Sequence, residues 1–229
     1  MSHINNNAIT GRPNRNVGWL VTCLIFLIVI VDQVSKFYVK THFYLGEAYE
    51  VFPWFQIRFI ENNGMAFGME LFSKYLLTFG RIAAVVFFVW FIRKALRTIC
   101  LRTGFFIAGA MIIAGAAGNI FDCVFYGEIF NNPFPPAHAQ FLPPGGGYAG
   151  WFEGKVVDML YFPFFSFTWP GWIPVFGGRE FEFFQYIFNI ADSSICVGVA
   201  LLLIFYGSDC SRAFSVVMSD KPAKVDAGL

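Results

Sequence analysis

Four apolar stretches constrain this 229-residue chain more than any other feature, because each approaches the length needed to cross a bilayer. A helix needs about 20 mainly apolar residues to span the hydrocarbon core. The stretches cover residues 17–39, 75–92, 104–121 and 187–206. Only 14% of all residues are charged, whereas soluble domains carry roughly 25%. The sequence therefore predicts an α-helical integral membrane protein with four transmembrane helices, in which residues 17–206 form one membrane domain.

Basic residues predict how these spans are oriented, because cytoplasmic loops carry an excess of lysine and arginine. Such residues precede the first span, join the second to the third, and follow the fourth. We therefore expect cytoplasmic tails at residues 1–16 and 207–229, and outer segments at 40–74 and 122–186. Alternating β-branched and aromatic residues at 49–60 predict strands in the first outer segment. The second is rich in proline, glycine and aromatic residues, which predicts loops and short strands.

The cysteines and histidines argue against a metal centre. The five cysteines form no C-x-x-C pair, the three histidines are scattered, and no H-E-x-x-H is present. The net charge of +1 gives no basic field that would attract nucleic acid. We therefore expect no metal site and no nucleic-acid partner.

Unusual polar residues gather at one predicted face of the membrane. They come from five separated parts of the chain, yet the predicted topology places all of them at one depth, either at the outer ends of the spans or in the outer segments. Convergence of this kind is expected of an active site at a membrane surface. The residues are Asp32, Lys36, Asn62, Gly64, Asn119, Asp122, Asp158, Asn189 and Asp192.

Several of these residues also have a purely structural interpretation. Asp32 and Lys36 are four apart and can form an ion pair along one helix. Asn119 and Asp122 can cap a helix or satisfy the backbone at a helix end. Asp158 and Asp192 have no basic residue four positions away on a helix. The residues alone therefore favour catalytic or ion-conducting carboxylates at these two positions.

Three other classes of function stay open at this point. A serine protease would use Ser35-Lys36 or Ser73-Lys74, but neither pair has a matching partner motif and no G-x-S-x-G is present. A transporter or proton channel predicts relay carboxylates near the bilayer midplane and polar residues on both faces. A structural membrane protein leaves the clustered aspartates and asparagines without a role.

Five short segments match, in order along the chain, the motifs of one family. They are Asp32-Gln33-Val34-Ser35-Lys36, Asn62 to Gly68, Gly115 to Asp122, Gly154 to Asp158, and Phe188 to Ile195. Any one of them is a weak signal, but five in order on the predicted outer face is a strong one. The chain thus resembles lipoprotein signal peptidase (signal peptidase II), a family of bacterial membrane aspartic peptidases.

The resemblance implies that Asp158 and Asp192 form a catalytic dyad. It implies cleavage of prolipoproteins before a diacylglyceryl-modified cysteine, in the bacterial inner membrane, with the active site at the periplasmic face and no metal or cofactor. Membrane lipids and prolipoproteins are the implied partners, and a monomer is expected. The implied supporting residues are Asp32, Lys36, Asn62, Gly64, Asn119, Asp122, Asn189 and Ala191.

The chain departs from the family pattern at Cys123 and in the two stretches that flank Asp158. Cys123 stands where the family usually has arginine after the G-N-x-x-D aspartate, and we expect Arg81 in the second span to supply the missing charge. The stretches on either side of Asp158, residues 128–153 and 161–186, are longer than usual for the family.

Overall fold

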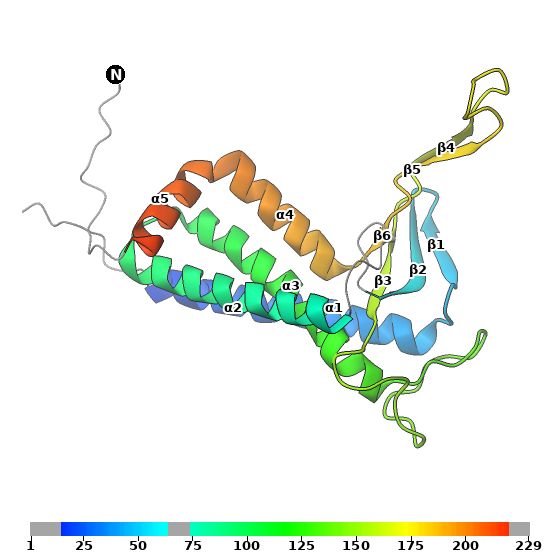
Figure 1. Cartoon of the computed structure of the whole chain (residues 1–229), viewed down its shortest axis with the longest axis horizontal. Helices are drawn as coiled ribbons and strands as arrows, with labels where there is room; N and C mark the ends of the chain where they lie inside the picture. The colour runs from blue at the N-terminus through cyan, green and yellow to red at the C-terminus, as the bar shows by residue number, and fades with distance from the viewer. Residues whose placement is uncertain (1–14, 64–73, 220–229) are drawn as a thin grey trace, which may run out of the picture. The chain divides into compact units, whose positions relative to one another are not determined.

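The computed structural model describes residues 15–63 and 74–219 of the chain (Figure 1). The helices are α1 (Arg15–His42), α2 (Lys74–Thr98), α3 (Thr103–Ile129), α4 (Ile190–Phe205) and α5 (Gly207–Met218). The strands are β1 (Ala48–Phe52), β2 (Phe55–Asn62), β3 (Val156–Tyr161), β4 (Phe165–Thr168), β5 (Glu180–Phe183) and β6 (Ile187–Phe188).

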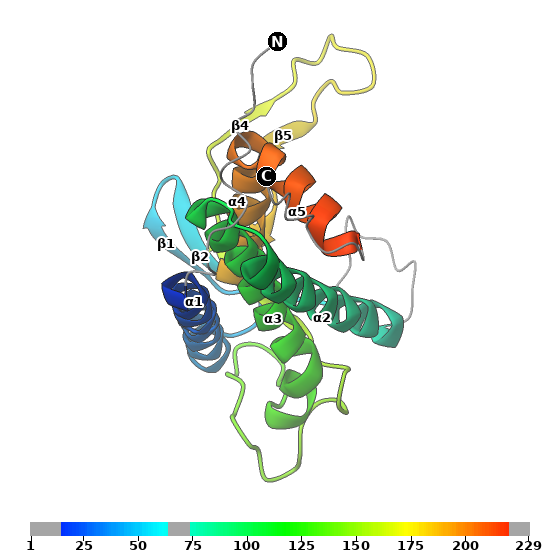
Figure 2. The same cartoon turned by 90° about the vertical axis from the view of Figure 1, so that its left-hand side faces the viewer.

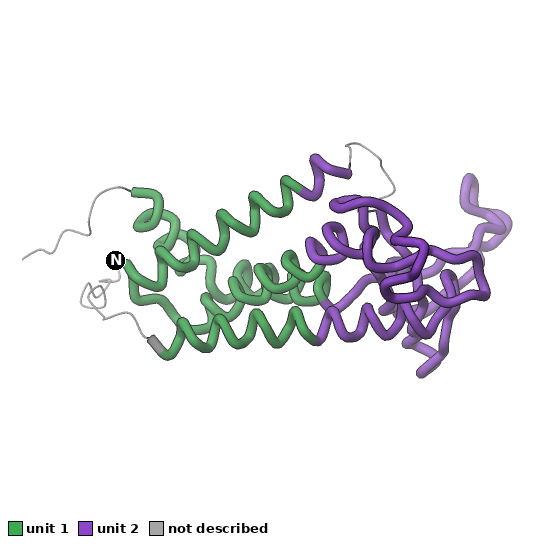
Figure 3. The backbone as a smooth tube through the Cα atoms, turned by 90° about the horizontal axis from the view of Figure 1, so that it is seen from below, with its two compact units in different colours: residues 1–30, 79–118, 191–229 green, residues 31–78, 119–190 purple. Residues whose placement is uncertain are grey.

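Contacts divide the chain into two compact units (Figure 3). Unit 1 comprises residues 1–30, 79–118 and 191–229, and unit 2 comprises residues 31–78 and 119–190. Each unit is assembled from segments that are far apart in the sequence, and α1 and α3 contribute to both. No single boundary in the sequence therefore separates the two units.

Three helices in the described part of the chain, α1, α2 and α3, are long and apolar enough to cross a membrane. The helix α4 has 16 residues and meets α5 at a bend of 93°, so this pair supplies a fourth span only if both helices are counted together. The predicted class, a helical membrane protein with a small β part, is confirmed, while the number of four spans stays a prediction. The helix α4 begins at Ile190 because the two residues of β6 pair with β3 instead.

The core of unit 1 is built from apolar faces of its helices. Its buried members are Val17, Val21, Ile92, Ala95, Phe105, Phe106, Ala110, Ile113, Ala213 and Val217. The last two belong to α5, a helix within the segment that the sequence analysis assigned to a tail. The same helix carries the fully buried Asp209, whose carboxylate binds Arg102 at 2.5 Å and Arg212 at 2.7 Å.

Unit 2 contains a four-stranded antiparallel sheet in the order β1-β2-β3-β6. The strand β3 lies in the middle and is buried along nearly its whole length, as expected of a run of apolar residues with strands on both sides. In the register of β2 with β3, Ile60 faces Asp158 and Glu61 faces Val157. This pairing fixes the position of Asp158 inside the unit.

The strands β4 and β5 form a separate hairpin that projects from the end of this sheet, as Figure 2 also shows.

The helix α3 is longer than predicted. The sequence analysis ended the third span at residue 121, but the helix continues to Ile129. The added turns are retained because Tyr126 and the adjoining Phe130 are buried in the core of unit 2, beside Val39, Phe59, Val157 and Met159. Asn119 and Asp122 consequently lie inside a helix, and the interpretation of these two as helix-end residues was wrong.

Candidate functional site

A lysine and two aspartates form a buried ion cluster on the facing sides of α1 and α3 within unit 2. The ammonium of Lys36 lies 2.9 Å from Asp32 and 2.8 Å from Asp122, and it donates to Oδ1 of Asn119 at 2.8 Å. An ammonium has three N–H donors, so these three acceptors occupy all of them. Asp32, Lys36 and Asp122 are fully buried. One turn of α1 and one turn of α3 therefore supply all the charged groups of this cluster.

Two residues that the sequence analysis did not select complete this cluster. The side-chain amide of Gln33 donates to Asp32 at 3.1 Å and to Asp122 at 2.8 Å. Its carbonyl oxygen accepts a hydrogen bond from the hydroxyl of Tyr126 at 3.2 Å. Tyr126 follows Asp122 by four residues on α3, and this spacing is the signal that would have identified it.

The carboxylate of Asp158 is held by side-chain amides. Asp158 lies in β3 and is almost fully buried. It accepts a hydrogen bond from Asn189 at 2.7 Å and another from Asn62 at 3.2 Å. Asn189 also donates to Oδ1 of Asn119 at 3.2 Å. Because Asn119 accepts from Lys36 as well, hydrogen bonds run without interruption from the ion cluster to Asp158.

Close backbone approach brings the start of β3 against α3. The backbone N–H of Val157 donates to Asp122 at 3.3 Å, and that of Gly154 donates to the carbonyl oxygen of Cys123 at 2.9 Å. A Cβ on Gly154 would overlap the carbonyl oxygen of Asp122. Glycine at position 154 thus permits the contact that places Asp158 next to the ion cluster.

A second buried ion cluster was missed by the sequence analysis. Glu61 binds Lys40, and it also binds Lys155 at 3.0 Å. The side chains of Lys40 and Glu61 are at most 3% exposed. Burial alone would raise the pKa of the Glu61 carboxyl, but the two lysines outweigh this effect and hold the pKa below its usual range. Lys40 follows Lys36 by four residues on α1, which is the signal that places both lysines on one face.

Aromatic rings surround the buried ammonium of Lys40. The rings of Phe59, Phe130 and Tyr148 lie with their centroids 5.7, 5.3 and 5.2 Å away. Such contacts stabilise a cation that has lost its hydration. The second ion cluster therefore ties α1 to β2 and to the segment that leads into β3.

A polar cavity of about 540 Å³ opens beside Lys155. Inside unit 2, Lys74 donates to the backbone carbonyl of Glu153 at 2.5 Å, and the backbone N–H of Lys155 donates to the hydroxyl of Tyr148 at 2.7 Å. The side chain of Lys155 is 26% exposed. The cavity gives water access to one edge of the second ion cluster. Its lining residues are Lys74, Asn132, Tyr148, Ala149, Glu153 and Lys155.

Asp192 and Ala191 belong to unit 1. Asp192 is partly buried in the first turn of α4, where the helix dipole favours a negative charge. Ala191 is fully buried, and a Cβ on Gly115 would overlap its carbonyl oxygen. Ser194 donates to the carbonyl of Met111 at 2.8 Å, which fastens the start of α4 to α3.

The structure therefore brings together most of the residues selected from the sequence. Gly64 lies outside the described residues. Arg81 lies on α2 in unit 1, and its expected replacement of the missing arginine stays a prediction. Among the described residues, no group of three or more histidine, cysteine, aspartate or glutamate side chains is placed to hold a metal ion. The residues joined within unit 2 are Asp32, Lys36, Asn62, Asn119, Asp122, Asp158 and Asn189.

A family model and several relatives that resemble this chain all point to the same family. The family described as Signal peptidase (SPase) II matches residues 24–207. A lipoprotein signal peptidase of Porphyromonas gingivalis is 48% identical over 204 residues, covering 89% of this chain and 88% of the relative. One of Amoebophilus asiaticus is 32% identical, covering 81% and 77%. A solved structure of a bacterial membrane enzyme has a TM-score of 0.56 at 25% identity, covering 90% of this chain and 94% of that one.

Proposed function

Because this chain belongs to the signal peptidase II family, we propose that it is an aspartic endopeptidase that removes signal peptides from prolipoproteins. The bond cut is the one before a cysteine that carries a diacylglyceryl group. The relatives named lipoprotein signal peptidase match over most of both chains, which supports this substrate class. The apolar helices place the enzyme in the membrane, where such a substrate resides.

Asp158 and Asp192 are the proposed catalytic pair. Asp158 is buried and held in one orientation by two amides. Asn189, one of those amide donors, precedes Asp192 by three residues. Because they are only three positions apart along the chain, the Cα atoms of Asn189 and Asp192 lie within about 11 Å of each other. This short tether supports the assignment of Asp192 as the second carboxyl group.

The proposed chemistry follows from two carboxyl groups in one site. Two adjacent negative charges repel each other, so the proposed pair holds a single proton. The ionised carboxylate takes a proton from water while that water attacks the scissile carbonyl carbon. The protonated carboxyl donates a hydrogen bond to the carbonyl oxygen and stabilises the tetrahedral state. Proton transfer to the leaving amide nitrogen then breaks the C–N bond and releases the signal peptide.

The remaining polar residues position this pair in the proposal. Lys36 neutralises Asp32 and Asp122, which otherwise would be two uncompensated buried charges. Asn119, which Lys36 holds in place, accepts a hydrogen bond from Asn189 and so fixes the position of the Asn189 side chain. Asn189 in turn donates to Asp158 and orients its carboxylate. Asn62 holds the second oxygen of Asp158. The supporting roles that the family resemblance implies for Gly64 and Ala191 are part of the same proposal.

The proposal also includes the setting of the enzyme. We place both termini in the cytoplasm and the catalytic pair at the periplasmic face of the bacterial inner membrane. Water is available there, while the acyl chains of the substrate remain in lipid. A monomer has one complete set of the proposed residues, so no second copy is needed for the reaction.

The observation that carries the proposal is the hydrogen-bonded path from Lys36 through Asn119 and Asn189 to Asp158. The test is cleavage of a diacylglyceryl-modified prolipoprotein peptide by the purified protein in nanodiscs, with products mapped by mass spectrometry. We expect one cut, before the lipidated cysteine, and none in the unmodified peptide. Equal cleavage of both peptides, or a cut elsewhere, would sink the proposed specificity. Cleavage that survives in the folded Asp158→Asn variant would sink the proposed mechanism.

A further inference from the structure

The hairpin formed by β4 and β5 has one face made only of phenylalanine. Its register pairs Phe165 with Phe183 and Phe167 with Phe181. Successive residues of a strand point to opposite faces, so these four side chains share one face. The paired rings lie 4.8 Å and 5.1 Å apart between centroids. We call this surface the phenylalanine face.

The opposite face of the hairpin is polar. The same register pairs Ser166 with Glu182 and Thr168 with Glu180. The hairpin is therefore strictly amphipathic, with two glutamates and two hydroxyl side chains behind four aromatic rings. This separation needs a defined register, because a slip of one residue would mix the two faces.

The phenylalanine face is exposed within its unit. Its four side chains are between 37% and 52% exposed. The turn beyond them adds Trp172 at 81% and Val175 at 77%. A two-stranded hairpin is at best marginally stable in water, and an exposed apolar patch of this kind marks an interaction surface. Something apolar is needed to cover this face.

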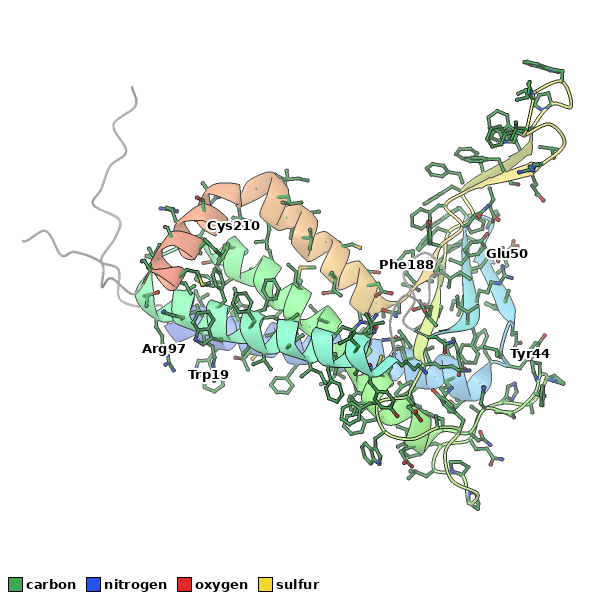
Figure 4. All side chains as sticks on the ribbon, viewed as in Figure 1. Trp19, Tyr44, Glu50, Arg97, Phe188 and Cys210 are labelled. Carbon is green, nitrogen blue, oxygen red and sulfur yellow. The ribbon has the colours of Figure 1, made fainter. Side chains whose placement is uncertain are left out.

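Ring contacts continue from the phenylalanine face to the main sheet of unit 2. The ring of Phe183 lies 6.4 Å from Phe164, Phe164 lies 5.9 Å from Phe162, and Phe162 lies 6.3 Å from Trp54. Figure 4 shows aromatic side chains following the hairpin from its base to its tip. The phenylalanine face is thus the outer end of a longer aromatic surface.

We propose that the phenylalanine face of this hairpin lies in the interfacial region of the lipid bilayer and anchors residues 161–186 to the membrane surface. The segment is joined at both ends to the sheet of a membrane-embedded protein, so a lipid surface is the apolar phase always available to it. This inference goes beyond the proposed peptidase activity and does not depend on it.

The composition of the segment favours lipid over a protein partner as the occupant. Residues 161–186 contain twelve aromatic side chains, two β-branched aliphatic ones (Ile173 and Val175) and no leucine. Amphipathic segments that lie in the membrane interface bury tryptophan, phenylalanine and leucine on one face. Well-packed protein contacts rely mainly on leucine, isoleucine and valine beside phenylalanine, and this segment has almost none of these aliphatic residues. The glutamates of the polar face would be repelled by anionic headgroups, so that face turns to water. Attachment is therefore apolar, and it does not weaken when salt is added.

Two neighbouring positions of β4 provide a matched test. The variants Phe167→Trp and Thr168→Trp each add one tryptophan, on opposite faces of the same strand. Each full-length variant is placed in phosphatidylcholine nanodiscs, with and without bromine on the acyl chains. Its emission is compared with that of the wild type under the same conditions. A second pair on β5, Phe181→Trp and Glu180→Trp, repeats the test if a β4 variant does not fold.

The result we expect is that the emission added by Phe167→Trp is shifted to the blue and loses more than half its intensity to brominated lipid. The emission added by Thr168→Trp should be quenched by aqueous acrylamide and not by bromine. Acrylamide quenching at both positions would overturn the proposal, because the face would then lie in water. Shielding at position 167 without bromine quenching would also overturn it, in favour of a second copy or another protein. Shielding that appears only after substrate is added would overturn it in favour of substrate as the occupant.

Discussion

Unit 2 holds its buried carboxylates in two different ways. Asp32 and Asp122 share the ammonium of Lys36, at 2.9 and 2.8 Å. Asp158 receives hydrogen bonds from the amides of Asn62 and Asn189. An ammonium supplies a compensating positive charge, whereas an amide orients a carboxylate without adding a formal charge. This difference is what the proposed mechanism requires, in which the ion cluster is scaffold and Asp158 takes part in proton transfer.

The largest effect is expected at the amide-held carboxylate. Asp158→Asn should lower kcat by about a thousandfold or more, because the side chain can no longer exchange a proton. The free energy of unfolding should fall by about 1–3 kcal/mol, since Asn189 and Asn62 donate to different oxygens of Asp158 and the amide that replaces one oxygen leaves one of these buried donors without its acceptor. Turnover of a lipidated peptide and thermal unfolding in detergent measure both. If Asp158→Asn kept full activity, Asp158 would not differ in function from the carboxylates bound to Lys36.

The ion cluster should show the opposite pattern. Lys36→Met leaves Asp32 and Asp122 buried without their cation, and removal of one partner from a buried ion pair costs about 3–5 kcal/mol of stability. Chemical denaturation of the two proteins in the same detergent measures the loss. Adding Asp122→Asn to Lys36→Met should recover part of the stability, because one buried charge is removed. A Lys36→Met protein as stable as the wild type would contradict the scaffold role.

The contact between the start of β3 and α3 should respond to a single methyl group. Gly154→Ala places a Cβ against the carbonyl oxygen of Asp122, and overpacking of this kind costs about 1–3 kcal/mol. Activity should fall as well, because Asp158 follows on the same strand. Gly145→Ala is the matched control, since a Cβ there meets no atom within 4 Å. Equal behaviour of the two variants in unfolding and turnover would argue against this contact as a positioning element.

The smallest effect is expected from the pH dependence of the second ion cluster. The pKa of Glu61 in the folded protein lies below its ordinary value of 4.5. Its contribution to stability is therefore complete above that value and is lost as the pH falls through the lower folded pKa. The melting temperature of the wild type should drop more than that of Glu61→Gln when the pH is lowered from 7 to about 4. Parallel curves for the two proteins would contradict the ion-pair interpretation of Glu61.

The sequence predicted which polar residues lie together better than it predicted the segments around them. Asp32, Lys36, Asn119 and Asp122 were selected because the predicted topology places them at one face of the membrane and because they lie in the family motifs. Hydrophobic length identified the helices α1, α2 and α3. The contacts of Glu61 with Lys40 and Lys155 were missed because they join three distant segments, and no local pattern encodes such a pairing. The helix α5 was missed because Asp209 and its neighbours read as a polar tail until the partner Arg102 is known. The extension of α3 was missed because the apolar run was interrupted by Asp122.

The phenylalanine face was visible only once the strands were paired. Residues 161–186 were identified in the sequence as an unusually long aromatic stretch without an assigned role. Alternation within either short strand does not show which residues of the other strand lie opposite. The register of Phe165 with Phe183 supplies that information. It shows that the phenylalanines of both strands share one face of the hairpin and that the polar residues share the other.

The most direct test of the central claim is a double-mutant cycle on the catalytic pair. Turnover of a diacylglyceryl-modified prolipoprotein peptide is measured for the wild type, Asp158→Asn, Asp192→Asn and the double variant, all shown to be folded by thermal unfolding and to bind the peptide. Residues that act as one unit give losses that do not add, so the double variant should be no slower than either single variant. Losses that multiply, or a single variant that retains wild-type turnover, would contradict a shared aspartate pair.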